Sequence, residues 1–290
     1  MTDSQRTPSQ ASPIPATPGQ VPRTVPGSIS RLSRFEPASV APESVDAHRY
    51  FHVVESRVWE DSRPADPEFA THFLGVLDGA ACWGVDVPHG DDPSDGGALD
   101  LYSYFGRASE DEWLVAGRAV QIVEWGRTHR FCGRCGERTE QADGERAMRC
   151  PRCRLLSFPR LAPAMITLVT RGDRGPDQEA LLARGVQFRA PMYSCLAGFV
   201  EPGETLDGAV IREVREEVGV AIDDVRYAGS QPWPFPHSLM LGFRATWVDG
   251  EIQCDPKEIV DANWYRKDDL PPIPPGISIA RKLIDAWLHE

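Results

Sequence analysis

The segment from Gly198 to Val220 reads GFVEPGETLDGAVIREVREEVGV. Three of its acids, Glu213, Glu216 and Glu217, are spaced i, i+3 and i+4, so on a helix their carboxylates share one face. Like charges at this spacing destabilise a bare helix, and a bound cation offsets their repulsion. Because Mg²⁺ and Mn²⁺ take hard oxygen ligands, the run predicts a divalent-metal site.

The residues around these acids predict how the segment folds. Every fourth residue of Leu206–Val218 is apolar, which indicates a helix that packs on a sheet. Gly219 suits a left-handed C-cap, and Arg212 is placed to pair with Glu204 and hold the preceding loop against the helix. Gly198 lets that loop approach the metal. The alternative is a solvated acidic helix face, which the complete spacing pattern disfavours.

The composition narrows the class of protein. The chain has 290 residues and a formal net charge of −12, which argues against broad electrostatic binding to nucleic acid but not against a phosphate-bearing substrate. No apolar run approaches the ~20 residues that a membrane span needs, and no leader opens the chain. The cysteines include two close pairs, which suits a metal site in a reducing compartment better than a disulfide framework. We therefore expect a soluble cytoplasmic protein.

The first half of the chain is expected to hold two parts. Residues 1–30 are rich in Pro, Ser, Thr and Gln, which predicts a disordered tail. Residues 31–128 are expected to form a mixed α/β domain without a catalytic signature, whose roles are packing and support of a dimer. Its expected elements are strands at 51–54, 73–77 and 81–85, a hairpin at Asp78-Gly79, an exposed loop at 91–97 and a helix at 109–127.

Residues 129–158 carry the paired cysteines. Cys132 and Cys135 form one Cys-x-x-Cys turn, and Cys150 and Cys153 form a second. Two such turns close a tetrahedral site whose positions are all filled by protein, which predicts a structural zinc ribbon with one Zn²⁺ per chain. A redox dithiol and accidental cysteines are the alternatives. Arginines make the ribbon locally basic, which fits solvated surface or a face that contacts RNA; they are Arg130, Arg134, Arg149, Arg152 and Arg154.

Residues 159–290 alternate strands and helices, which predicts a mixed α/β sandwich. Five strands are expected, at 165–170, 180–183, 193–197, 225–228 and 239–248. Two helices are expected, at 206–218 and 279–288.

Residues 230–238 read SQPWPFPHS and form a loop in this interpretation. Three prolines restrict the chain, so Trp233 and Phe235 are held with little entropy left to lose on binding. Rigid aromatic rings suit stacking on a nucleobase or nicotinamide, and the polar residues of the loop offer hydrogen bonds. A proline-locked structural loop, or a PxxP-like ligand for another protein, fits the composition equally well.

Residues 198–220 resemble the Nudix box at every spaced position. The resemblance implies a Nudix hydrolase, which cleaves a nucleoside diphosphate linked to another moiety, and an α/β/α sandwich. Glu213 and Glu217 are the expected Mg²⁺ or Mn²⁺ ligands, and Glu217 is also the expected water-orienting base. Glu216 is expected to support them or to add a ligand. The resemblance adds the backbone carbonyl of Ala197 as a metal ligand, and the catalytic set is completed by the pair Arg212 and Glu204.

The nonapeptide after the box and the cysteine ribbon before it together resemble the NADH pyrophosphatase family, over roughly residues 110–290. The resemblance implies hydrolysis of NAD(H) to nicotinamide mononucleotide and AMP, removal of NAD caps from RNA, and a homodimer. It places a further metal-ligand glutamate at Glu258. Phe158 stands where some members carry tyrosine, a change that keeps stacking but loses a hydroxyl hydrogen bond. The implied substrate contacts are Glu145, Phe158, Phe199, Gln231, Pro232, Trp233, Pro234, Phe235, Pro236, His237, Ser238 and Ala280.

We therefore expect an α+β protein with an N-terminal mixed α/β domain, a four-cysteine zinc ribbon and a C-terminal Nudix α/β/α sandwich at 159–290, acting as an NAD(H) diphosphatase. One rival is the same enzyme working mainly on NAD-capped RNA or on another nucleoside diphosphate derivative. Another is a catalytically inactive nucleotide sensor or RNA-binding regulator. The presence of every acid of the box speaks against the inactive protein.

Overall fold

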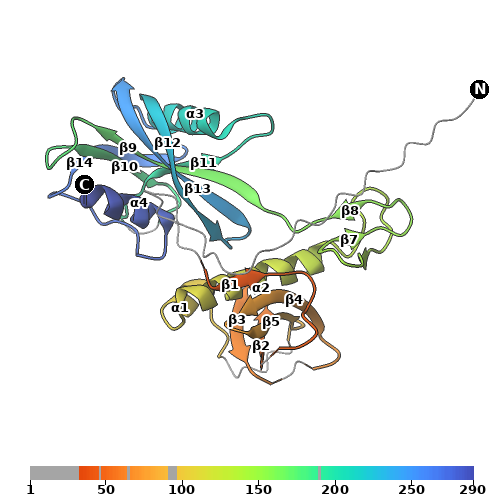
Figure 1. The fold of residues 1–290 in the computed structure, drawn as a ribbon. Coiled ribbons are helices and arrows are strands. Elements are labelled where there is room, and N and C mark those ends of the chain that lie inside the picture. The colour runs from red at the N-terminus through yellow and green to blue at the C-terminus, as the bar shows by residue number, and fades with distance from the viewer. Residues whose placement is uncertain (1–32, 46, 64–65, 91–96, 189–190) are drawn as a thin grey trace, which may run out of the picture.

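The computed structural model describes residues 33–45, 47–63, 66–90, 97–188 and 191–290. The expected tail at 1–30 and most of the expected loop at 91–97 lie outside the described residues. Figure 1 shows an N-terminal sheet with a long helix beside it, a small ribbon at the far end of that helix, and a C-terminal sheet with helices. This is the α+β organisation that the sequence predicts, with a mixed α/β domain, a ribbon and an α/β/α sandwich.

Five strands form the N-terminal sheet in the order β1-β4-β5-β2-β3. They are β1 (Phe35–Pro37), β2 (Ala47–Val54), β3 (Arg57–Asp61), β4 (Ala70–Leu77) and β5 (Ala80–Asp86). Asp78 and Gly79 join β4 to β5 with φ angles of 52° and 81°, so the expected hairpin is confirmed. The sequence pattern does not predict β1 or β3, which are short and carry charged residues.

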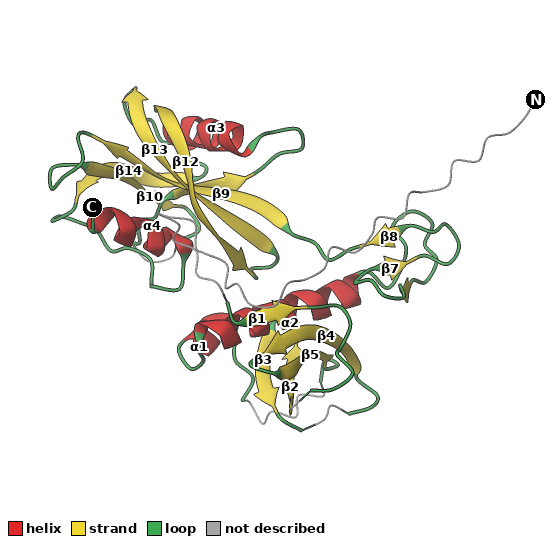
Figure 2. Cartoon of the chain, in the orientation of Figure 1, coloured by secondary structure: helices red, strands yellow, loops and turns green. Residues whose placement is uncertain are grey.

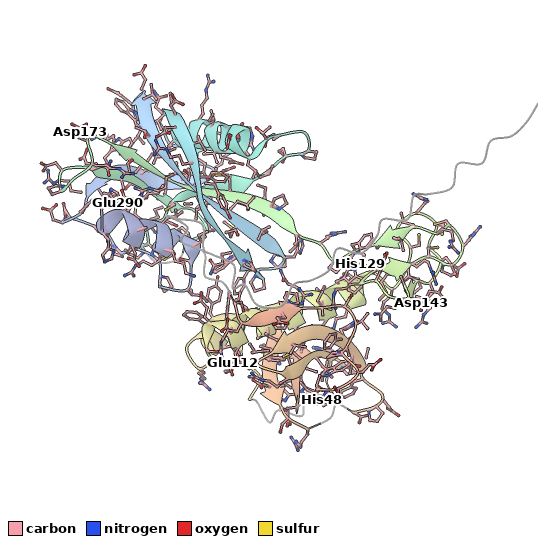
Figure 3. The ribbon with its side chains drawn as sticks, viewed as in Figure 1. His48, Glu112, His129, Asp143, Asp173 and Glu290 are labelled. Atoms are coloured by element: carbon pink, nitrogen blue, oxygen red, sulfur yellow. The ribbon has the colours of Figure 1, made fainter. Side chains whose placement is uncertain are left out.

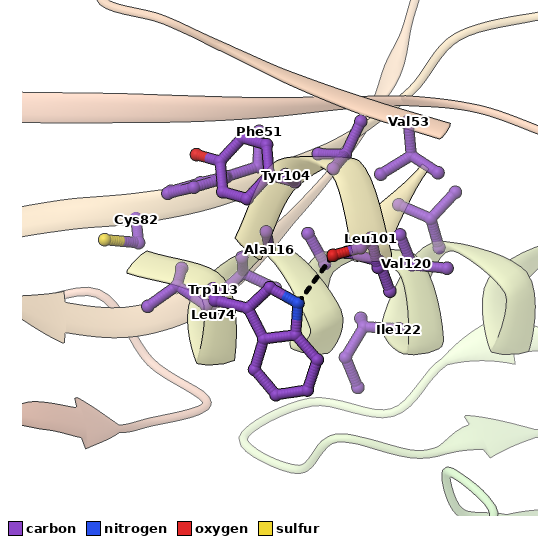
Figure 4. Packing of buried hydrophobic residues seen from close by; sticks show 14 of the residues in the cluster. Phe51, Val53, Leu74, Cys82, Leu101, Tyr104, Trp113, Ala116, Val120 and Ile122 are labelled. Carbon is purple, nitrogen blue, oxygen red and sulfur yellow. Dashed lines mark hydrogen bonds between the residues drawn. The ribbon is translucent and has the colours of Figure 1, made fainter. Parts of the chain in front are cut away.

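The described residues of this domain form two helices, α1 (Leu101–Phe105) and α2 (Glu110–Thr128). Ser109 begins α2 with a capping box, in which its hydroxyl and its N–H both bond to Glu112. Trp113 is buried among the apolar residues between α2 and the sheet, and its indole N–H donates to the carbonyl of Leu101 at 2.8 Å (Figure 4). This bond ties α1 to α2 and fixes the position of α1.

The ribbon follows α2 directly, and His129 and Asp143 are two of its residues labelled in Figure 3. Its short strands are β6 (Glu140–Gln141), β7 (Met148–Arg149) and β8 (Leu156–Ser157), paired in that order. Apart from two cysteines, the buried apolar residues of the ribbon are Ala142 and Ala147. A core this small cannot stabilise a fold alone, so a bound metal has to contribute to the stability of the ribbon.

The C-terminal domain is a six-stranded sheet between two helices, as Figure 2 shows. Its strands run in the order β12-β13-β9-β10-β14, and β11 pairs with β9. They are β9 (Ala162–Arg171), β10 (Glu179–Gly185), β11 (Leu196–Phe199), β12 (Ala221–Trp233), β13 (Ser238–Asp249) and β14 (Ile259–Arg266). One face is covered by α3 (Leu206–Val218) and the other by α4 (Ile279–Leu288), both with the bounds that the sequence predicts.

Three strands differ most from the sequence-based expectation. A strand is predicted at 225–228, whereas β12 spans thirteen residues, and one is predicted at 193–197, whereas β11 begins at Leu196. No strand is predicted where β14 lies. The edge strand β12 exposes charged residues such as Asp223 and Arg226, which interrupt its apolar pattern, so its pairing with β13 decides its length.

Residues 230–238 form the end of a hairpin, and the prediction of a loop over the whole segment is wrong. Ser230–Trp233 are the last residues of β12 and pair with residues 238–241 of β13, which leaves only 234–237 as the turn. Pro232 is tolerated in the strand because β12 lies at the edge of the sheet, where a missing N–H removes no ladder bond. The pairing holds the two aromatic residues of the segment in fixed positions.

The tip of this hairpin packs on the N-terminal domain. A Cβ atom added to Gly117 of α2 would lie 2.8 Å from Cγ of Pro234, so the helix has room for the proline ring only because residue 117 is glycine. The ring centroids of Trp113 and Trp233 are 6.3 Å apart. A salt bridge of 2.9 Å from Lys282 on α4 to Glu110 on α2 adds a second contact between the domains.

We expect Gly117→Ala to destabilise the protein. In a helix interior this change normally stabilises by about 1 kcal/mol. Here the added methyl group overlaps a rigid proline ring, and overpacking costs about 1–3 kcal/mol. Thermal unfolding followed by circular dichroism measures the difference. An unfolding temperature at or above that of the unchanged protein would contradict the described packing.

Candidate active site

The two ends of α3 place its acids. Thr205 caps the start, where its hydroxyl accepts a hydrogen bond from a backbone N–H. Gly219 ends the helix with a left-handed φ of 76°, as the sequence predicts. Between these caps Val210, Val214 and Val218 are fully buried against the sheet. Since this apolar stripe fixes the rotation of the helix, it also fixes the direction of the neighbouring carboxylates.

Arg212 connects the preceding loop to the helix. Its guanidinium donates two hydrogen bonds to the carboxylate of Glu204, at 2.6 and 2.9 Å, and one to the carbonyl of Phe199 at 3.0 Å. Its Nη1 donates to Glu213 and to Glu216, both at 2.9 Å. The bond from Arg212 lowers the pKa of Glu204 to about 2, so this bidentate pair stays ionised at neutral pH.

Three carboxylates meet beside α3. Glu213, Glu217 and Glu258 each bring one oxygen within 4.8 Å of the other two. The first two side chains are buried, and Glu258 lies exposed in the turn before β14. A Cβ atom at Gly198 would lie 2.0 Å from Cδ of Glu213, so only glycine permits this arrangement. Glu216 lies outside the group, with a side chain that is 61% exposed.

The electrostatics of this carboxylate group favour a cation. Burial, and then the charges of Glu213 and Glu258, raises the pKa of Glu217 to about 8. Burial also raises the pKa of Glu213. Among the described residues, Oε2 of Glu217 is buried and has no hydrogen-bond partner. An orphaned carboxylate oxygen beside two further carboxylates fits a hard divalent cation, so these three residues form the set that could hold one.

A cavity of about 280 Å³ opens beside Glu217. Much of its wall is apolar and comes from the sheet, from the loop before α4 and from the start of α4. The predicted site residues on this wall are Ala197, Glu217, Gln231, Trp233 and Ala280. An apolar cavity with Glu217 on its wall, and two further carboxylates beside Glu217, suits a ligand that has a flat ring and a phosphate group nearby.

Gln231 already has two partners inside the protein. Its Nε2 donates to the carbonyl of Ile277 at 2.7 Å, and its Oε1 accepts from the N–H of Ile279 at 2.7 Å. These bonds tie the end of β12 to the start of α4, and both elements border the cavity. Gln231 therefore joins two elements of the cavity wall, and this role does not depend on a further hydrogen bond to a ligand.

The other predicted substrate residues lie away from the cavity wall, within the described part of the chain. Pro232 and Pro234 face α2, and Phe235 packs on an aromatic ring of α1. Phe199 is exposed on β11, and Glu145 and Phe158 are exposed on the ribbon. The full set away from the wall is Glu145, Phe158, Phe199, Pro232, Pro234, Phe235, Pro236, His237 and Ser238.

The four ribbon cysteines lie together. Their Sγ atoms are all within 4.8 Å of one another, and the pairs Cys132–Cys153 and Cys135–Cys150 are each 3.5 Å apart. A tetrahedron of sulfurs around zinc has edges of about 3.8 Å, whereas a disulfide needs about 2 Å. In each turn a backbone N–H donates to the first cysteine's sulfur, at 3.4 Å. The cluster fits a structural Zn²⁺ with no position left for a substrate.

Sequence reasoning missed several residues of the cavity wall. Tyr102 comes from α1 of the N-terminal domain, far along the chain from the box. Met192 and Met240 look like ordinary core residues, and Pro274 and Ile277 belong to the turn before α4. No local pattern marks any of them, because only the tertiary fold brings them to one place.

Comparison with known families and proteins agrees with this arrangement. The chain matches the NUDIX domain over residues 160–287, the NADH pyrophosphatase zinc ribbon domain over 127–158, and the NADH pyrophosphatase-like rudimentary NUDIX domain over 46–125. It is 48% identical over 219 residues to the NAD-capped RNA hydrolase NudC of Pseudomonas putida (strain W619), which covers 76% of this chain and 78% of that protein. The chain belongs to the NADH pyrophosphatase family of Nudix hydrolases. Residues 46–125 of its N-terminal domain are therefore similar to a rudimentary, or reduced, Nudix domain, which the sequence pattern does not predict.

A second relative of this Nudix hydrolase is the NAD-capped RNA hydrolase NudC of Pseudomonas aeruginosa (strain LESB58). The two are 55% identical over 178 residues, which cover 61% of this chain and 62% of that one. Among solved structures, a NUDIX hydrolase from Nitrosomonas europaea has a TM-score of 0.44 at 21% identity, over 55% of this chain and 90% of that one. Within the described residues, no helix of the hydrolase has the length and apolarity to cross a membrane.

We expect Cys150→Ser to lose zinc. Cys150 is fully buried in the cysteine cluster, and a hydroxyl cannot replace a thiolate as a zinc ligand. Elemental analysis of the purified Nudix hydrolase should give about one Zn²⁺ per chain, and well below that in the variant. Cys254→Ser, which changes a half-buried cysteine outside the ribbon, is the matched control and should keep its zinc. Full zinc in Cys150→Ser would contradict the assignment.

The raised pKa of Glu217 gives the metal-free protein a pH-dependent stability. The folded pKa is about 8 against an ordinary value of 4.5, so between these values the folded state binds more protons than the unfolded one. Stability therefore falls as pH rises from about 4.5 to about 8. Without added divalent ion, the unfolding temperature should fall less over this pH range for Glu217→Gln than for the unchanged protein. An equal fall in both proteins would show that the pKa of Glu217 is not raised.

Proposed function

We propose that this Nudix hydrolase cleaves the pyrophosphate of NAD(H) to nicotinamide mononucleotide and AMP, and also removes NAD caps from RNA. The observation that carries the proposal is the position of Glu217, which belongs both to the carboxylate group and to the wall of the apolar cavity. A ligand in the cavity would thus have a ring against apolar residues and its phosphates beside the acids. The names of the NudC relatives point to the same substrates.

The residues of the site have different roles in the proposed hydrolysis. Glu213, Glu217 and Glu258, with the carbonyl of Ala197, would hold Mg²⁺ or Mn²⁺, which neutralises the diphosphate and lowers the pKa of the attacking water. As the water oxygen attacks one phosphorus, Glu217 accepts the proton of the water, and the bond from that phosphorus to the bridging oxygen breaks, which separates nicotinamide mononucleotide from AMP. Arg212 keeps the loop and the helix in register through its bonds to Glu204 and Phe199. Glu216 supports Arg212 from the exposed side.

The aromatic hairpin supplies the ring-binding part of the site. Trp233 lines the cavity, and the pairing of β12 with β13 keeps it in place without substrate. A ring already held in position loses little entropy on stacking, which favours the flat nicotinamide or adenine of a dinucleotide. Ala280 at the start of α4 also lines the cavity, and its small side chain takes little of the cavity's space.

We further propose that the enzyme is a homodimer. Glu145 and Phe158 lie on the ribbon and do not border the cavity of their own chain among its described residues. If they contact substrate, a second chain has to bring them. The ribbon and its exit also expose apolar side chains, with Phe131 at 64% and Leu161 at 59% exposed, which an interface would cover.

NAD-capped RNA as the main substrate is the second candidate. Exposed arginines lie on the ribbon and just after it, and they suit an RNA backbone better than a free dinucleotide. The exposed set is Arg130, Arg134, Arg138, Arg152, Arg154 and Arg160.

We also place the enzyme in the cytoplasm, since its ribbon thiols must stay reduced to bind zinc. The limits 31–128, 129–158 and 159–290 are our proposed domain boundaries.

We expect the purified protein to release AMP and nicotinamide mononucleotide from NADH when Mg²⁺ or Mn²⁺ is added. Glu217→Gln should lower kcat by about 10²–10⁴-fold, because it removes both a metal ligand and the proton acceptor. Glu43→Gln, an exposed acid of the N-terminal domain, is the matched control and should match the unchanged enzyme. Chromatography of the products against time measures both.

Two results would overturn this function. One is tight NADH binding without release of AMP, which would leave a nucleotide sensor. The other is unchanged turnover in Glu217→Gln, which would remove the role given to that residue. If replacing the exposed ribbon arginines lowers activity on capped RNA but not on free NADH, the second candidate is favoured.

A further inference from the structure

One aromatic side chain that lines the cavity comes from the N-terminal domain. Tyr102 is the single wall residue that belongs to the N-terminal domain, among the residues the structure describes. It is the second residue of α1, and the carboxylate of Asp100 accepts hydrogen bonds from its N–H and from that of Ser103. Through the bond from Trp113 to Leu101, α1 is also fixed to α2. Tyr102 therefore stands in a defined place before any ligand arrives.

Tyr102 belongs to an aromatic group with the two rings of the hairpin. Its ring stacks on Phe235, with centroids 4.4 Å apart and planes 22° from parallel. It meets Trp233 edge to face, with centroids 6.1 Å apart and an angle of 77°. Trp233 and Phe235 are themselves 4.9 Å apart. Stacked and edge-to-face pairs at these distances are the favourable geometries for aromatic rings.

The three rings do not have the same position relative to the cavity. Tyr102 and Trp233 line it, and Phe235 does not. Phe235 therefore backs Tyr102 by stacking on it, and Tyr102 presents its own surface to the cavity. Tyr102 is 53% exposed, although a large aromatic side chain usually gains by being covered. A supported, half-exposed ring at an apolar cavity is well suited to receive another flat ring.

We propose that Tyr102 is a substrate-binding residue that forms, with Trp233, the aromatic wall on which one ring of the dinucleotide stacks. The proposal rests on the proposed function, and it assigns to Tyr102 the stacking that the sequence suggests for Phe235. Phe235 acts through Tyr102 as a positioning residue. The reduced N-terminal Nudix domain thereby contributes a residue to the site of its catalytic neighbour.

The direct test compares Tyr102→Ala with Tyr102→Phe. Loss of the ring should raise KM for NADH by about tenfold, with kcat and the unfolding temperature nearly unchanged. Tyr102→Phe keeps the stacking ring and should restore KM. Tyr227→Ala is the matched control, since Tyr227 is 55% exposed and meets one ring edge to face, but does not line the cavity.

A binding measurement separates this inference from the proposed function. NADH binding is measured by energy transfer from tryptophan to NADH, with Ca²⁺ as the added ion. Hydrolysis is measured separately with Mg²⁺ or Mn²⁺. If the unchanged protein binds NADH but does not hydrolyse it, the function fails and weaker binding by Tyr102→Ala still supports the stacking role. If it hydrolyses NADH and Tyr102→Ala has the same KM and affinity as the unchanged protein, the inference alone is overturned. A protein that does not bind NADH overturns both.

A double substitution tests the support given by Phe235. Phe235→Ala should raise KM because Tyr102 loses the ring behind it, and the double variant with Tyr102→Ala should be no worse than Tyr102→Ala alone. Additive effects of the two changes would show that Phe235 contacts substrate independently, which would contradict its role as a positioning residue.

Discussion

The carboxylates of Glu213, Glu217 and Glu258 repel one another, and the other parts of the candidate site are arranged around this repulsion. Glu213 and Glu217 are buried on one turn of α3, with Glu258 beside them. Burial and mutual repulsion hold the pKa of Glu217 at about 8 in the metal-free protein. A divalent cation reverses the sign of the interaction, because each repelling oxygen becomes a ligand. Gly198 contributes by leaving space for the carboxylate of Glu213, so a residue without a side chain is part of the arrangement.

The remaining structure keeps a cavity next to this charged group. The helix α2 covers the N-terminal sheet, seats Pro234 of the hairpin beside Gly117, and leads into the ribbon. The hairpin in turn borders the cavity with Trp233. The N-terminal domain, which has no acidic box of its own, thus supports the hairpin that borders the cavity of the neighbouring domain. The ribbon needs zinc for its own stability, because it has almost no apolar core.

Local signals explain which parts of the fold could be predicted from sequence. The bounds of α3 follow from Thr205 and Gly219, which lie within the segment itself. The cysteine cluster could be predicted because the spacing of its two Cys-x-x-Cys pairs is also a local feature of the sequence. The length of β12 could not be predicted, because its charged residues face solvent at a sheet edge and its partner strand decides its extent. No local sequence pattern marks Tyr102 as a cavity residue, since only packing between the domains brings it to the cavity.

We propose that Glu213, Glu217 and Glu258 together hold the divalent cation that makes this Nudix hydrolase active. Diffraction from crystals soaked with Mn²⁺, measured on both sides of the manganese absorption edge, locates that ion directly. We expect an anomalous peak at about 2.0–2.2 Å from carboxylate oxygens of these three residues, next to the cavity bordered by Trp233. A group that stays empty while Mn²⁺ is bound elsewhere, or an active enzyme in which the group never binds metal, would contradict it.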